Sequence, residues 1–182
     1  MIESPCVSPG RHPARTWPLR AALIGLGLLV GTALAQEPAR SVVGPVASAR
    51  SRTLVLRLRP GQDLRQELLR AVEREGLEAA AIVTCVGSLT RANLRFANQP
   101  QGSAVEGHHL EIVSLVGTLS THGSHVHLAV SDETGRTLGG HLLDGCTVYT
   151  TAEVVLVALD DLRFRRDVDP DTTWKELVIE RR

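Results

Sequence analysis

The chain has 182 residues, with 20 basic and 20 acidic side chains, a formal net charge of zero and 43% hydrophobic residues. This length allows one domain with a real hydrophobic core and an appendage. Proteins that bind nucleic acid usually carry a basic excess, so the balanced charge argues against a nucleic-acid partner.

The N-terminus predicts an export signal. Three arginines precede an apolar run over residues 21–34, and the small-x-small pattern Ala-Leu-Ala follows at residues 33–35. The alternative is a membrane anchor, but a membrane span needs about 20 apolar residues and this run is shorter. We therefore expect a signal peptide over residues 1–35 and cleavage after Ala35. The mature protein would be exported, periplasmic or secreted, with no stable membrane anchor.

The predicted domain begins after a linker. Residues 36–52 are rich in Ala, Ser, Pro and Arg without a period, which indicates a flexible linker before a domain over residues 53–180. Residues 53–59 alternate apolar and polar side chains, as a half-buried strand does. Asp63 and Gln66 then form a capping-box pattern at the start of an amphipathic helix, for which Gly76 is the natural end.

The rest of the domain is predicted to be mainly β. Residues 79–86 form a continuous apolar strand, and Gly87-Ser88 is interpreted as a turn into a strand over residues 92–97. Further strands are expected over residues 109–119, 124–131, 136–147, 148–159 and 162–168, and a short closing helix over residues 172–180. This order predicts an α+β domain in which one main amphipathic helix covers a largely antiparallel sheet.

A hairpin over residues 124–147 predicts a cluster of histidines. In the strand SHVHLAVS the valines and leucine occupy one face, so His125 and His127 share the other. The loop Asp-Glu-Thr-Gly at residues 132–135 fits a three-residue hairpin turn with a bulge at Gly135, which pairs His127 with His141. Two glycines before His141 would allow close backbone approach or a kink. A register shifted by one residue would place His141 on the apolar face and remove the cluster.

Three histidines and an open fourth position are a recognised zinc arrangement, and imidazole also binds iron, nickel and copper. We therefore predict a transition-metal site, with zinc as the first expectation, formed by His125, His127 and His141. Alternatively, these histidines only fill polar positions on a sheet or at a subunit contact. Three other histidines are less suited as ligands because loop histidines are usually solvated: His108, His109 and His122.

Two carboxylates are candidates for proton transfer near a bound metal. Glu153 and Glu111 each interrupt an apolar strand, where a buried carboxylate would need a partner. Each could equally face a subunit interface. Cys85 and Cys146 lie in apolar runs, which favours two buried thiols, although an exported pair could form a disulfide.

The order of several segments resembles the plants and prokaryotes conserved (PPC) domain family, in its prokaryotic stand-alone type. The similarity covers residues 53–178 and rests on RLRPGQDL, VTCVGSLTRANLRFA, LEIVSLVGTLS, HVHLAVSDETGRTLGGHLLDGC and TTAEVVL. The resemblance implies an α/β domain with a major antiparallel sheet, packed as a homotrimer. The prokaryotic branch typically shows H-x-H and G-G-H pieces, which correspond here to His125, His127 and His141.

The resemblance does not extend to the DNA-binding segments of the family. Plant members join this domain to AT-hook segments that bind DNA, but this sequence has no such hook and its charge is balanced. The N-terminal signal pattern and the histidine pattern predict an exported protein that binds a transition metal, and the resemblance implies that it is a homotrimer. A non-catalytic binding or scaffold module is the alternative, and a DNA-binding protein is the least favoured hypothesis. Whether the protein is an enzyme stays open, with Glu153 and Glu111 as catalytic candidates.

Overall fold

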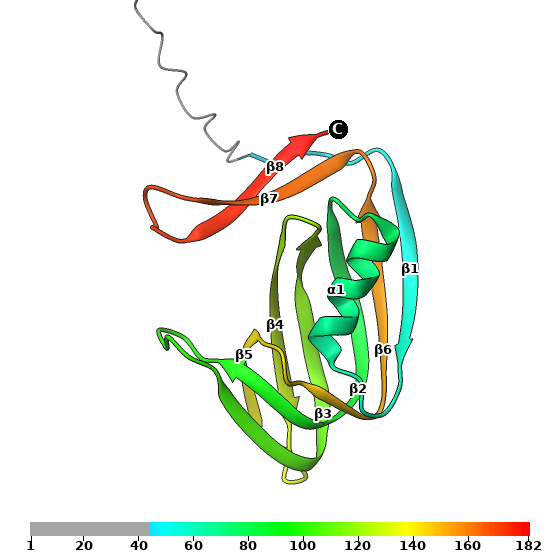
Figure 1. The fold of residues 1–182 in the computed structure, drawn as a ribbon, viewed down its shortest axis with the longest axis vertical. Helices are drawn as coiled ribbons and strands as arrows, with labels where there is room; N and C mark the ends of the chain where they lie inside the picture. The colour runs from blue at the N-terminus through cyan, green and yellow to red at the C-terminus, as the bar shows by residue number, and fades with distance from the viewer. Residues whose placement is uncertain (1–43) are drawn as a thin grey trace, which may run out of the picture. The chain divides into compact units, whose positions relative to one another are not determined.

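The computed structural model describes residues 44–182, which contain eight strands and one helix (Figure 1). The predicted signal peptide and the first part of the predicted linker lie outside the described residues, as does the side chain of His108. The elements in chain order are β1 (Ser51–Leu58), α1 (Leu64–Glu75), β2 (Ala80–Arg95), β3 (Ser103–Ser120), β4 (Gly123–Ser131), β5 (Thr137–Leu142), β6 (Thr147–Leu159), β7 (Leu162–Val168) and β8 (Lys175–Arg181).

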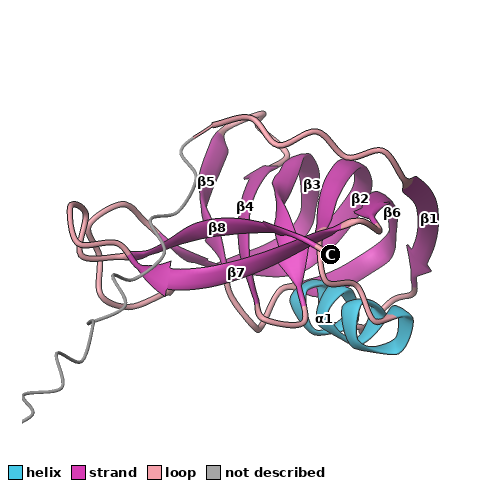
Figure 2. Cartoon of the chain, turned by 90° about the horizontal axis from the view of Figure 1, so that it is seen from above, coloured by secondary structure: helices cyan, strands magenta, loops and turns pink. Residues whose placement is uncertain are grey.

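The main sheet has six strands in the order β1-β6-β2-β3-β4-β5, and every pairing in it is antiparallel. The end of β2 also pairs with β5, so that β2, β3, β4 and β5 close into a ring. A separate two-stranded sheet, β7-β8, lies across one end of the main sheet (Figure 2). The predicted mostly antiparallel β domain with one helix is confirmed.

The helix begins and ends where its capping residues predict. The Asp63 carboxylate accepts a hydrogen bond from the backbone N–H of Gln66 at 2.9 Å, and Gly76 ends the helix in the left-handed conformation with φ 59°. The apolar stripe of α1 supplies Leu64, Leu68 and Val72 to the same hydrophobic core as the buried sheet residues. Among residues 44–182, no helix is long and apolar enough to cross a membrane.

The predicted turn at Gly87-Ser88 is wrong, because β2 runs without interruption from Ala80 to Arg95. Gly87 has φ 144°, and the register between β2 and β6 shifts between Gly87 and Leu89. A Cβ added at Gly87 would lie 2.1 Å from the carbonyl oxygen of Thr151. The glycine therefore allows close strand contact at a bulge rather than a reversal of the chain.

The predicted closing helix is also wrong. Residues 175–181 form β8, which pairs antiparallel with β7. Leu177 and Ile179, two positions apart, pack against a small cluster that contains buried Leu162 and Phe164. This spacing fits a strand, and a short apolar run does not by itself distinguish strand from helix.

Both cysteines of the described part are buried free thiols. Cys85 lies on β2, and Cys146 lies just before β6 and accepts a hydrogen bond from the backbone N–H of Asn93 at 3.2 Å. Burial raises the pKa of each thiol to about 11. Both side chains act as small apolar core residues, which agrees with the favoured interpretation of the sequence.

Candidate metal centre

The hairpin turn sets the register of β4 against β5. The backbone N–H of Asp132 donates to the carbonyl of Arg136 at 3.0 Å, and Gly135 has φ 79°. The Asp132 carboxylate also accepts hydrogen bonds from the backbone N–H groups of Thr134 and Arg136, at 2.9 and 3.0 Å. The resulting register places His127 opposite His141, so the predicted turn and pairing are confirmed.

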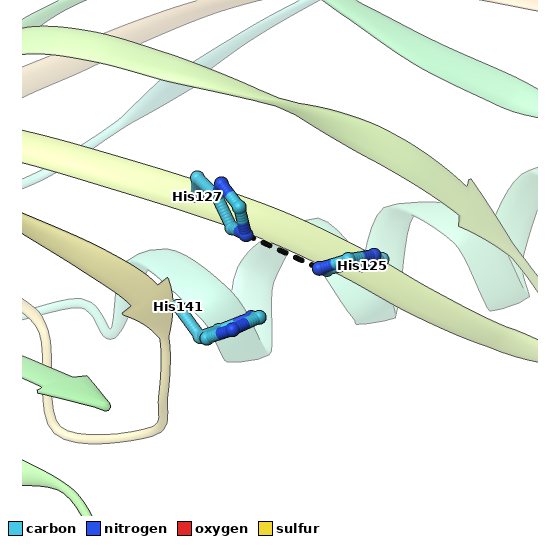
Figure 3. Close-up of side chains that lie close together, drawn as sticks. All are labelled: His125, His127 and His141. Carbon is cyan, nitrogen blue, oxygen red and sulfur yellow. Dashed lines mark hydrogen bonds between the residues drawn. The ribbon is translucent and has the colours of Figure 1, made fainter. Parts of the chain in front are cut away.

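Three imidazoles from β4 and β5 point toward one another (Figure 3). The intervening Val126 and Leu128 are buried, so the histidines of β4 lie on the face of the sheet that points away from the core. The Nε2 atoms of His125 and His127 are 3.1 Å apart, and the ring of His141 stacks on that of His125 with centroids 5.1 Å apart. One candidate ligand atom from each ring lies within 4.8 Å of the other two. Two nitrogens bound to one tetrahedral zinc are about 3.3 Å apart, so the three residues could hold a metal ion.

The surroundings of His125 and His141 favour neutral imidazoles at these two positions. Burial lowers the pKa of His125, and the nearby Arg166 guanidinium and His127 lower it further. Burial likewise lowers the pKa of His141, with a further contribution from the charge of Arg95. Only a neutral imidazole offers a lone pair to a metal, so these shifts keep the nitrogens available for coordination near neutral pH.

Gly140 allows β5 to approach β2 directly before His141. A Cβ added at Gly140 would lie 2.8 Å from the carbonyl oxygen of Arg95 and 3.4 Å from Cβ of Leu94. Because Arg95 and Leu94 pair with His141 and Leu142, this approach places the third imidazole. The close backbone approach expected at this glycine is confirmed.

The structure does not bring the two candidate carboxylates to the histidines. Glu153 is exposed on β6, opposite Arg57 of β1 and Val86 of β2. Glu111 is exposed on β3, opposite Ser88 and Ser131. Neither belongs to the histidine cluster, and neither needs a buried partner.

The remaining described histidines lie apart from the cluster. The Nε2 atom of His109 lies 3.1 Å from the hydroxyl of Tyr149. His122 lines the pocket beside the cluster but is not a member of it.

Two arginines at the cluster were not found from the sequence. Arg95 pairs with His141 across the ring closure between β2 and β5. Arg166, on β7, donates a hydrogen bond from Nη2 to the Thr118 hydroxyl at 2.6 Å, and its Nη1 lies 3.4 Å from Nδ1 of His125. The sequence shows that β7 is rich in arginine, but this composition does not indicate which residues the strand packs against.

Comparison with known proteins adds to this picture. The model of the Plants and Prokaryotes Conserved (PCC) domain, the PPC family of the sequence analysis, matches residues 46–160. The chain is 41% identical over 181 residues to a Synechococcus protein described as bifunctional protein GlmU. That match covers 95% of this chain but only 28% of the relative.

Two solved structures resemble the fold. A hypothetical protein from Salmonella enterica is 44% identical with a TM-score of 0.73, over 75% of this chain and 98% of that one. A metal-containing protein from Archaeoglobus fulgidus is 27% identical with a TM-score of 0.60, over 70% of this chain and 93% of that one.

Proposed function

Because this chain belongs to the Plants and Prokaryotes Conserved (PCC) domain family, we propose that it is a metal-binding member, in which His125, His127 and His141 hold a divalent transition metal. The observation that carries the proposal is that the Nε2 atoms of His125 and His127 are 3.1 Å apart and that the ring of His141 stacks on the ring of His125. Zinc is the first expectation, because it favours three imidazoles and an open position.

The geometry of the hairpin and one related structure support this proposal. All three ligands come from one hairpin whose turn fixes their register, so little ordering would accompany metal binding. The related Archaeoglobus fulgidus protein is described as metal-containing. A metal ion held by three histidines would act as a Lewis acid and would lower the pKa of a water molecule that it coordinates.

Elemental analysis of purified protein tests the proposal. We expect about one zinc per unaltered chain, and a loss of that zinc in His127→Ala. His122→Ala is the matched control, because His122 lines the same pocket but lies outside the cluster. Absence of any transition metal from the unaltered chain after growth with added zinc would refute the proposal. Equal metal contents in His127→Ala and the unaltered chain would refute it as well.

We further propose that the chain forms a homotrimer through the exposed face of its sheet. Five valines of β1, β2 and β3 are between 51% and 75% exposed: Val55, Val83, Val86, Val113 and Val116. Clustered apolar side chains of this kind usually mark an interface with another protein chain. Val116 pairs with His127, so the face adjoins the histidine cluster.

The mass of the protein in solution tests the assembly. We expect a trimer from light scattering, and smaller species for the double variant Val55→Lys/Val86→Lys. Val168→Lys is the control, because Val168 is 64% exposed but lies on β7. If the unaltered chain is a monomer in solution, the proposal that these valines form a subunit interface is refuted. A trimer that persists in the double variant would place the interface elsewhere.

We also propose that the protein is exported, on the basis of the basic leader, the apolar run and the Ala-Leu-Ala pattern over residues 1–35. The mass of the protein from its native host is expected to correspond to a chain that begins at Gln36. A full-length mass in that host would contradict export by cleavage. The balanced charge gives no support to nucleic-acid binding, and we expect no retention on heparin at physiological salt.

A further inference from the structure

A pocket of about 970 Å³ lies beside His125 and His141 and extends to the β7-β8 hairpin. Its size is within the range of about 300–1,000 Å³ that is usual for small-molecule sites. Its lining is strongly basic, although the chain as a whole is neutral. Four cationic side chains line it, with Glu176 as the single carboxylate among the lining residues: Arg65, Arg95, Arg166 and Lys175.

Arg95 stands next to the third histidine without a balancing carboxylate. It pairs with His141 in the sheet, and its side chain is half-buried. Other arginines nearby are neutralised: Arg65 pairs with Asp144 at 2.6 Å, and Arg91 pairs with Glu106 at 3.2 Å. Within residues 44–182, Arg95 forms no ion pair.

Arg166, on β7, also borders the cluster. Its guanidinium is anchored by the Thr118 hydroxyl and contacts the far ring nitrogen of His125. It forms no ion pair within 4.0 Å in the described part of the chain, but the carboxylate of Glu176, on β8, lines the same pocket and its charge raises the pKa of Arg166. Glu176 offsets part of the positive charge of these two half-buried guanidinium groups. A metal ion on the histidines would add positive charge beside them, which favours binding of a further anion.

We propose that Arg95 and Arg166 bind a small anionic ligand, through a carboxylate or a phosphate group, in the pocket beside the three histidines. A guanidinium presents paired N–H donors that match the oxygens of either group, and such charge-assisted hydrogen bonds are strong. The two arginines come from β2 and β7 and line the same pocket, so a compact anion bound there could reach both. This inference rests on the proposed metal site, because a bound divalent cation adds to the positive charge that the anion offsets.

Calorimetric titration with inorganic phosphate and with lactate, a simple carboxylate, tests this inference on the zinc-loaded and the metal-free full chain. We expect at least one of the two anions to bind, more tightly when zinc is present. Arg95→Gln and Arg166→Gln should each weaken binding by about 10- to 100-fold, as the loss of a charge-assisted hydrogen bond does. Arg65→Gln is the matched control, since it removes a charge from the same pocket but one already paired with Asp144, and we expect less than about threefold change.

Zinc content is measured on every sample, so the two proposals can fail separately. If the chain holds zinc but binds neither anion, the inference on the arginines is overturned and the metal site stands. If no zinc binds, the metal site fails, and phosphate or lactate binding to the metal-free chain that depends on Arg95 still supports the arginines. Equal losses in Arg65→Gln and Arg95→Gln would overturn the inference, because the effect would then be one of overall charge. Binding of phosphate alone or of lactate alone identifies the group recognised.

Discussion

Substitution of Gly140 by alanine should weaken the metal site without altering any histidine. The added methyl would lie 2.8 Å from the carbonyl oxygen of Arg95, whereas ordinary van der Waals contact begins at 3.4 Å. The neighbouring atom is backbone, so β5 must move away from β2 by about 0.6 Å. A metal–nitrogen distance tolerates only about 0.2 Å, so His141 would no longer fit the geometry set by His125 and His127. We expect zinc affinity to fall by about 10- to 100-fold, the usual cost of losing support behind a ligand.

The assay is competition for zinc with a coloured chelator, together with thermal unfolding of each variant. Gly139→Ala is the control, because its methyl would meet Cβ of Ala129 and the carbonyl oxygen of Leu128 at 3.3 Å, where a shift of about 0.1 Å suffices. We expect that variant to retain affinity within about threefold. The reasoning would be refuted if Gly140→Ala bound zinc as tightly as the unaltered chain, or if Gly139→Ala lost as much affinity.

Four further outcomes are expected. Because the pKa values of His125 and His141 lie below the ordinary 6.5, zinc should stay bound at neutral pH and be released as pH falls below 6.5; retention after dialysis at pH 4 would contradict this. In the metal-free chain the unfolded state takes up protons first, so stability should also decline below pH 6.5. With pKa values of about 11, Cys85 and Cys146 should resist iodoacetamide at pH 8 and react only in denaturant; rapid labelling of native protein would count against their burial. Leu68→Ala, at a side chain 1% exposed, should lower the free energy of unfolding by about 2–5 kcal/mol in denaturant titrations, and a loss under about 1 kcal/mol would show that α1 contributes little to the core.

The histidine cluster could be predicted because its determinants are local. Alternation along SHVHLAVS, a turn with glycine in the left-handed conformation and a fixed count from that turn place His127 opposite His141. The helix was equally local, since Asp63 and Gly76 mark its two ends. Each of these features depends on residues a few positions apart.

The errors and omissions involve contacts between distant parts of the chain. The Gly-Ser pair at Gly87 is typical of a turn in the sequence. Only the close contact of the Thr151 backbone with Gly87 shows that this glycine permits a bulge instead. Residues 175–181 become a strand because β7 offers an edge and a small apolar cluster to pack on. The roles of Arg95 and Arg166 depend on the β2–β5 pairing and on the position of the β7-β8 hairpin, neither of which follows from the pattern of either segment.

The pairing of β2 with β5 has a consequence for self-association. A terminal strand of an open sheet presents unpaired N–H and C=O groups, which can recruit a strand from another molecule. At Leu142 and His141 these groups already face β2, so the strand that carries the third imidazole is protected there by its own chain. The opposite end of the sheet order is β1, which within residues 44–182 pairs on one side only, with β6. β1 therefore offers an open edge along its whole length for intermolecular strand addition, whereas β5 is covered by β2 at the histidine end.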